Sequence, residues 1–245
     1  MKRLTKAFSA VLFIGAFSLQ AGELTLTTAN GFDLKADYYP SNIKSNRAVL
    51  MLHQCNYNRS MYNDIGEQLA KKGIHALSLD FRGFGESMND EFNIDKVQAL
   101  PQEQRRAAWQ KMSADWESDV QQAHDMLKSK VSGDAVIGVI GASCGGSQAI
   151  NLAEKNPIKV ISFFSSGQRQ ANIERYTNTL ADKPTLIIAS EEDGGTYTSA
   201  QELFKQAKNA DSRFIAYKGG DHGYPLLDKD THLGATIVSW FNNQL

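Results

Sequence analysis

The sequence contains little proline and little cysteine, and it has no low-complexity segment and no internal repeat. Its 245 residues include five prolines and two cysteines, and its charges are scattered along the chain. These features argue against a disordered protein. Because 42% of the residues are apolar and no linker interrupts the pattern, we expect one domain with one sizeable core.

An excess of basic residues is also missing. The chain has 26 lysines and arginines against 27 aspartates and glutamates, so it is poorly suited to hold nucleic acid through its phosphates. The sequence contains neither the histidine and glutamate spacing of a zinc site nor a glycine-rich phosphate-binding loop. We therefore expect no metal ion, no organic cofactor and no nucleic-acid partner.

Long apolar runs are absent apart from one near the N-terminus. A basic segment, residues 2–6, precedes an apolar run over residues 7–19 and the small pair Ala21-Gly22. This order is typical of a secretory signal peptide, which we place at residues 1–21; a buried N-terminal helix is the alternative. The run is short for a membrane span and no cysteine follows it for lipid attachment, so no stable membrane anchor is expected after cleavage.

The remaining chain, residues 22–245, would be an exported protein with 23 basic and 27 acidic residues. We expect it in the periplasm rather than fully secreted. An oxidising compartment would allow its two cysteines, Cys55 and Cys144, to pair.

Apolar patterning in residues 22–245 predicts eight strands. Residues 23–27 and 32–39 alternate around the turn signal Asn30-Gly31, which indicates an antiparallel hairpin. The later strands are short apolar runs, as expected in a sheet covered on both faces: residues 48–52, 76–79, 135–140, 160–164, 185–189 and 213–217. Helical periodicity lies between them, over residues 61–72, 116–127, 146–155, 198–208 and 231–241. This alternation predicts an α/β fold with a mostly parallel sheet.

One connection, residues 88–113, is longer than usual. Pro101 can begin a helix there, and Trp109, Met112 and Trp116 follow at helical spacing. The segment is either an extra packed helix or a lid over a pocket, because long ordered loops are often functional but need not be.

The stretch over residues 141–146, GASCGG, places a hydroxyl beside a thiol between a predicted strand and a predicted helix. At a sharp strand-to-helix turn, the residues two before and two after a nucleophile must be small. With Ser143 as nucleophile both positions are glycine, in the pattern G-x-S-x-G. With Cys144 they are alanine and glycine, so size alone leaves both residues as candidates.

Acidic residues and a histidine follow the last two predicted strands. The segment 184–193 ends in Glu191, Glu192 and Asp193, and His222 lies in the glycine-containing stretch 219–223. A hydroxyl becomes a good nucleophile when a base removes its proton, and an imidazole base needs a carboxylate to fix its tautomer. The order serine, acid, histidine therefore indicates a catalytic triad.

With these motifs the chain resembles the α/β-hydrolase fold serine hydrolases over most of residues 45–245. The segment 80–87, DFRGFGES, is similar to the family's D-x-R-G-x-G-x-S, in which Asp80 and Arg82 are mainly structural. The resemblance implies an eight-stranded sheet and a triad of Ser143, Asp193 and His222, with Glu191 and Glu192 as competing acids.

Few residues separate 164 from 184, where many members of this family insert a cap domain. The compact form resembles the dienelactone hydrolase and small carboxylesterase branch. Dienelactone hydrolases use a cysteine in G-x-C-x-G-G, and matching the glycines places Ser143 at the attacking position. The resemblance thus favours the hydroxyl over the thiol.

The family resemblance also assigns the oxyanion hole. The residue after the nucleophile, Cys144, and the third residue of the loop His53-Gln54-Cys55 would donate their backbone N–H groups. Gln54 stands where the family often has glycine, which puts the shape of this loop in question. Two amides aimed at one oxygen lie close enough for their side chains to be bridged. We therefore hypothesise a Cys55–Cys144 disulfide, the alternative being two free cysteines.

The expected reaction is hydrolysis of a small-molecule carboxylic ester or thioester through an acyl-enzyme on Ser143. One rival is a dienelactone-hydrolase-like enzyme that uses Cys144. A second is a non-catalytic binding protein on a hydrolase fold, and a third is an acyltransferase or peptidase with the same triad. Aromatic residues near the predicted site (Tyr57, Phe84, Trp109 and Tyr224) suggest an apolar pocket, although each could simply pack in the core.

Overall fold

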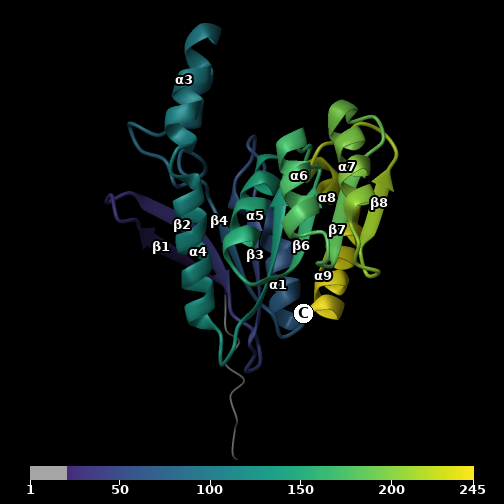
Figure 1. The fold of residues 1–245 in the computed structure, drawn as a ribbon. Coiled ribbons are helices and arrows are strands. Elements are labelled where there is room, and N and C mark those ends of the chain that lie inside the picture. Colours follow the sequence, from purple (N-terminus) through teal and green to yellow (C-terminus); the bar gives the residue numbers. More distant parts are fainter. Residues whose placement is uncertain (1–20) are drawn as a thin grey trace, which may run out of the picture.

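The computed structural model describes residues 21–245, so the predicted signal peptide, apart from Ala21, lies outside the described residues. The described chain forms one eight-stranded sheet in the order β1-β2-β4-β3-β5-β6-β7-β8 (Figure 1). The strands are β1 (Gly22–Thr27), β2 (Asp33–Tyr39), β3 (Arg47–Leu52), β4 (His75–Leu79), β5 (Val136–Ala142), β6 (Ile158–Phe164), β7 (Thr185–Ser190) and β8 (Arg213–Tyr217). Each corresponds to a strand predicted from the apolar pattern.

The sheet is antiparallel only at its N-terminal edge. β1 and β2 form the predicted hairpin, whose turn includes Gly31 at φ 79°, and β2 pairs antiparallel with β4. From β4 onward all strand pairs are parallel. The carboxyl ends of six strands consequently meet at one edge, where ligands bind in open α/β sheets.

Two groups of helices cover the two faces of the sheet. The α-helices are α1 (Asn63–Lys71), α2 (Ile94–Ala99), α3 (Gln102–Ser113), α4 (Trp116–Lys130), α5 (Cys144–Lys155), α6 (Gln170–Thr179), α7 (Gly194–Gln206), α8 (Tyr224–Lys229) and α9 (Thr231–Gln244). One apolar cluster joins the sheet to α4, α5, α6 and α7, and a second joins it to α1, α8 and α9. Among residues 21–245, no helix is both long and apolar enough to cross a bilayer.

Four short elements were not predicted from the sequence: the 3-10 helix η1 (Arg59–Tyr62), α2, α6 and α8. Only Ile173 and Tyr176 of α6 are buried, and α8 has six residues with proline near its start. Helices this short or this polar leave too few apolar positions to reveal a 3.6-residue period.

The long connection over residues 88–113 contains α2 and α3. In Figure 1, α3 extends beyond the rest of the molecule, and Met112 is its only buried residue. Trp109 and Trp116 belong to two successive helices, and their rings meet edge to face at 5.6 Å. The segment is therefore helical and partly packed, and its movement as a lid stays a prediction.

A buried ion pair fixes the segment that follows β4. Arg82 is 1% exposed, and its Nε and Nη2 donate to the two carboxylate oxygens of Asp119 on α4 at 2.9 and 2.8 Å. Trp116 Nε1 donates to the Arg82 carbonyl at 3.0 Å. Arg82 thus ties the DFRGFGES segment to α4.

Asp119→Ala is expected to lower the free energy of unfolding by about 3 kcal/mol, because it leaves the buried Arg82 guanidinium without its main partner. Glu117→Ala is the matched control: it removes an exposed carboxylate of the same helix that pairs with Lys155, so its effect should stay within about 1 kcal/mol. Urea unfolding measures both. Equal, small losses would contradict a buried pair that supports this segment.

Candidate active site

Ser143 occupies a sharp turn between β5 and α5. Its backbone lies at φ 49° and ψ −115°, a region that non-glycine residues rarely adopt. A Cβ at Gly141 would lie 2.3 Å from the Gly145 carbonyl oxygen, and one at Gly145 would lie 2.5 Å from the Leu52 carbonyl oxygen. Both flanking positions therefore have room for glycine alone, as the G-x-S-x-G pattern requires.

The structure brings the predicted acid and base together. Asp193 follows β7, His222 follows β8, and the His222 Nδ1–H donates to Asp193 Oδ2 at 2.6 Å. Among the described residues, neither of the competing acids, Glu191 and Glu192, forms a side-chain hydrogen bond or ion pair with His222. Asp193 is thus the carboxylate that orients His222.

Ser143 and the histidine loop contact consecutive residues at the end of β6. The Ser143 N–H donates to the Phe164 carbonyl at 2.9 Å, and the Gly223 N–H donates to Ser165 Oγ at 2.9 Å. Within residues 21–245, no hydrogen bond joins the Ser143 hydroxyl to His222. Catalytic hydrogen bonds of this kind are often long without substrate and tighten in the complex.

A disulfide joins Cys55 and Cys144, with their Cα atoms 5.8 Å apart and 88 residues between them in the sequence. Cys55 lies in the loop after β3, and Cys144 is the first residue of α5. Amides in the first turn of a helix have no intrahelical acceptor, so the Cys144 N–H can donate to a ligand. The hypothesised disulfide is therefore present, and it links the two residues predicted to donate to an oxyanion.

His53 shapes the loop that carries Cys55. Its ring is fully buried, Nδ1–H donates to the Gln54 carbonyl at 2.7 Å, and Nε2 accepts from the Phe81 N–H at 3.0 Å. Burial lowers the pKa of His53 to about 4, because a charged imidazole would lose its hydration. The neutral ring bridges the loop to the segment after β4.

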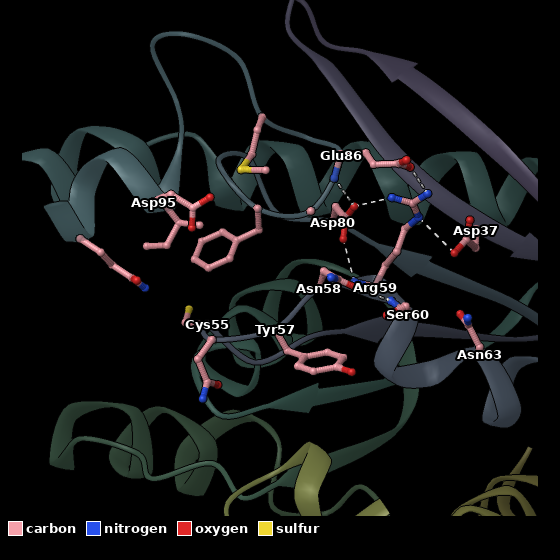
Figure 2. Close-up of a pocket in the computed structure, with 16 residues that line it drawn as sticks. Asp37, Cys55, Tyr57, Asn58, Arg59, Ser60, Asn63, Asp80, Glu86 and Asp95 are labelled. Carbon is pink, nitrogen blue, oxygen red and sulfur yellow. Dashed lines mark hydrogen bonds and ion pairs between the residues drawn. The ribbon is translucent and has the colours of Figure 1, made fainter. Parts of the chain in front are cut away.

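A cavity of about 880 Å³ begins beside Cys55 and extends between η1 and α2 (Figure 2). Tyr57 and Phe84 line it, together with Met88 and Ile94 from the long connection. Trp109 and Tyr224, the other aromatics proposed for a pocket, lie outside it: Tyr224 stacks on Tyr57 at 4.2 Å, and Trp109 contacts Phe84 edge to face. The cavity adjoins the disulfide rather than enclosing Ser143.

The far wall of this cavity is charged. Arg59 forms ion pairs with Glu23, Asp37, Asp80 and Glu86, and Figure 2 shows its guanidinium among the last three carboxylates. Asp80 also accepts from the backbone amides of Arg59 and Glu86. The Asp80 carboxylate therefore links the start of η1 to the segment that follows β4. Within residues 21–245, no cluster of histidine, cysteine and acidic side chains is suited to a metal ion.

A family model described as serine aminopeptidase, S33, matches residues 43–168 of the chain, about half of its length. This segment contains Ser143, Cys55 and Cys144, whereas Asp193 and His222 lie beyond it. No curated protein sequence matches the chain.

Solved structures share the fold at low sequence identity. A cold-adapted esterase from an Arctic intertidal metagenomic library has a TM-score of 0.70 and 19% identity, with 94% of this chain and 95% of that chain covered. An esterase from Pyrococcus furiosus has a TM-score of 0.67 and 18% identity, with 93% of each chain covered. A dienelactone hydrolase from Anabaena variabilis has a TM-score of 0.65 and 17% identity, with 92% and 99% covered.

Replacing both cysteines, Cys55→Ser with Cys144→Ser, should lower the free energy of unfolding by about 2–4 kcal/mol, because the unfolded chain is no longer constrained by a long loop. Dithiothreitol should lower the unfolding temperature of the wild-type protein and leave that of the double variant unchanged. Mass spectrometry after alkylation without reduction provides the direct check. Two alkylated cysteines in the wild-type protein would contradict the disulfide.

The free energy of unfolding should fall as the pH drops from about 6.5 to about 4, by roughly 3 kcal/mol from His53 alone. The folded state binds this proton less readily than the unfolded chain does, so neutral His53 stabilises the protein fully only above its unfolded pKa. Burial also lowers the pKa of His75, which adds an effect of the same sign. A His75→Gln variant removes the second histidine effect, and an equal free energy of unfolding in urea at pH 7 and at pH 4.5 in this variant would contradict the His53 contribution.

Proposed function

Because the chain belongs to the serine aminopeptidase S33 family of α/β hydrolases, we propose that it hydrolyses a small-molecule carboxylic ester or thioester through an acyl-enzyme on Ser143. The hydrogen bond between His222 and Asp193 carries this proposal, because it orients the imidazole through a carboxylate. The loop that carries His222 contacts the end of β6, as the Ser143 turn does. The esterases and the dienelactone hydrolase of the same fold support the ester class.

In the first half-reaction, His222 removes the Ser143 proton as Oγ attacks the carbonyl carbon. Asp193 keeps Nδ1 protonated, so Nε2 is the basic nitrogen, and the carboxylate stabilises the imidazolium that forms. The carbonyl oxygen becomes an oxyanion that accepts from the Cys55 and Cys144 N–H groups. The tetrahedral intermediate then expels the alcohol or thiol, which takes its proton from His222.

In the second half-reaction, water replaces the leaving group. His222 removes a proton from water as the water oxygen attacks the acyl carbon, and the same two amides stabilise the second oxyanion. Collapse of this intermediate releases the carboxylic acid, and the His222 proton returns to Ser143. All groups in the cycle belong to this chain or to water.

The disulfide bears on the alternative nucleophile. A cysteine attacks as a thiolate, and the Cys144 sulfur is bonded to Cys55. In the oxidised protein, therefore, only the hydroxyl of the GASCGG stretch is free to react. This observation supports Ser143 over a dienelactone-hydrolase-like use of Cys144.

We also propose that the protein is exported, with the periplasm as its compartment. The signal-peptide pattern of residues 1–21 supports export. The disulfide supports an oxidising environment, because such bonds persist mainly outside the reducing cytosol.

Ser143→Ala should lower kcat for ester hydrolysis by roughly 10⁴-fold or more, since water must then attack the bound ester directly and only the residual catalysis of the oxyanion donors and of binding remains. Cys55→Ala with Cys144→Ala is the comparison: it keeps both backbone amides and the hydroxyl but removes the disulfide that holds the amides together, so its loss of kcat should be far smaller than that of Ser143→Ala. Nitrophenyl esters of increasing acyl length, thioesters and an aminoacyl anilide together define the bond that is cleaved.

A fluorophosphonate probe followed by mass spectrometry should place the label on Ser143. Full activity of Ser143→Ala would exclude the serine mechanism. A wild-type protein that neither labels nor cleaves any of these compounds would instead favour a binding protein on a hydrolase fold.

A further inference from the structure

The backbone on both sides of His222 is held by side chains from three other strand ends. These contacts are hydrogen bonds: Ser190 Oγ donates to the Asp221 carbonyl at 2.5 Å, the Gly223 N–H donates to Ser165 Oγ at 2.9 Å, and the Tyr224 N–H donates to Gln54 Oε1 at 2.6 Å. Residues 221, 223 and 224 are thus each bound, and His222 lies among them. We call residues 221–224 the base loop.

All three side chains are almost completely buried. Ser190 and Ser165 are 0% exposed and Gln54 is 1% exposed. Ser190 ends β7, Ser165 follows β6, and Gln54 lies two residues after β3. A buried hydrogen bond is stronger than an exposed one, and a group left without its partner there is costly. The base loop is therefore fixed to the carboxyl edge of the sheet at three separate points.

We propose that Gln54, Ser165 and Ser190 are positioning residues that set the His222 imidazole for proton transfer, with Gln54 coupling it to the oxyanion loop. The inference rests on the function proposed above. None of the three side chains needs to touch the substrate, because each acts on the main chain that carries the base.

Gln54 joins two loops with different proposed roles: one carries the general base, and the other carries a predicted oxyanion donor. Its Oε1 accepts from the base loop, and its Nε2 donates to Asn56 Oδ1 at 2.5 Å, next to Cys55. A Cβ at Gly223 would lie 1.8 Å from Gln54 Oε1, so the base loop approaches as closely as glycine allows. The glutamine that departs from the family's glycine is thus the link between the general base and the predicted oxyanion donor.

Ser165 joins the base loop to the nucleophile. It is, with Ser143, one of two non-glycine residues in the described chain with positive φ, at 45°. Its N–H donates to the Ile188 carbonyl at 2.7 Å, while the adjacent Ser166 Oγ donates to the Ser143 carbonyl at 2.5 Å. Strained backbone of this kind is retained where the surroundings enforce it. The end of β6 therefore fixes the base and the nucleophile relative to each other.

A purely structural role would predict a loss of stability without a specific loss of turnover. The chain offers a matched control at the opposite end of β7, where Ser212 Oγ accepts from the Thr185 N–H at 3.1 Å. Ser212 is 7% exposed. Ser165→Ala and Ser212→Ala remove the same type of hydrogen bond, a backbone amide to a buried serine hydroxyl, and only the first touches the base loop.

Ser165→Ala should lower kcat on a nitrophenyl ester by roughly 10- to 100-fold with KM nearly unchanged, because small displacements of a catalytic group have effects of this size. Ser212→Ala should lose a similar amount of thermal stability and keep its kcat. If Ser165→Ala keeps the wild-type kcat, or if kcat falls by the same factor in both variants, the inference for Ser165 is overturned.

Gln54→Leu and Gln54→Glu test the second contact. Leucine removes the acceptor of the Tyr224 N–H and should reduce kcat as Ser165→Ala does, whereas glutamate keeps an acceptor and should restore part of the rate. If Ser165→Ala does not fold, the two Gln54 variants test the positioning role in its place. Leucine and glutamate variants with wild-type kcat would overturn the coupling.

Amide hydrogen exchange gives a readout that does not need turnover. In the free protein, the Gly223 and Tyr224 amides should exchange faster in Ser165→Ala and Gln54→Leu than in Ser212→Ala. A wild-type protein without hydrolysis or labelling would refute the proposed function even if these amides are protected. Wild-type hydrolysis with unchanged variant kinetics would refute only the positioning role.

Discussion

The close approach of Gly145 to the end of β3 is the contact on which the site depends. Because Gly145 has no side chain, the first turn of α5 lies directly against the carbonyls of Leu52 and His53. This places the residue before Gly145 beside the loop after β3, where the Cys55–Cys144 disulfide forms. The parallel strands from β4 onward then bring the acid and the base to the same edge. Without the contact at Gly145, the backbone amides of the two predicted oxyanion donors would not lie close enough together to bind one oxygen.

The charged and titratable groups around the site are held in fixed positions. His53 is neutral because it is buried between an acceptor and a donor, so it holds the loop without adding a charge beside the predicted oxyanion. Arg59 is surrounded by carboxylates on the far wall of the cavity, and Asp80 among them is completely buried. The backbone amides of the predicted oxyanion donors are also held in place, by the disulfide, so little reorganisation is required when charge develops at a carbonyl bound between them.

The sequence indicated the sheet and the candidate triad because both leave local signals. Two alternating segments and six apolar runs marked the strands, and Ser143, Asp193 and His222 each follow such a run within a few residues. The short helices α6 and α8 left too weak a period. The contacts of Gln54, Ser165 and Ser190 could not be predicted, because each is a single polar residue whose partner is distant in sequence. Gln54 gave one signal, its departure from the expected glycine, and that signal suggested disturbance rather than support.

The disulfide and the base-loop contacts constrain different groups of the proposed reaction. The disulfide fixes the distance between two amides, and the contacts of Ser165 and Ser190 fix the main chain beside the imidazole. Gln54 belongs to both groups, because it lies between His53 and Cys55 in sequence and against Tyr224 in space. In the proposed reaction, proton transfer and oxyanion formation occur in the same step, so their groups must be correctly placed together. The buried Gln54 amide contacts both loops, so one side chain can meet this requirement for both groups.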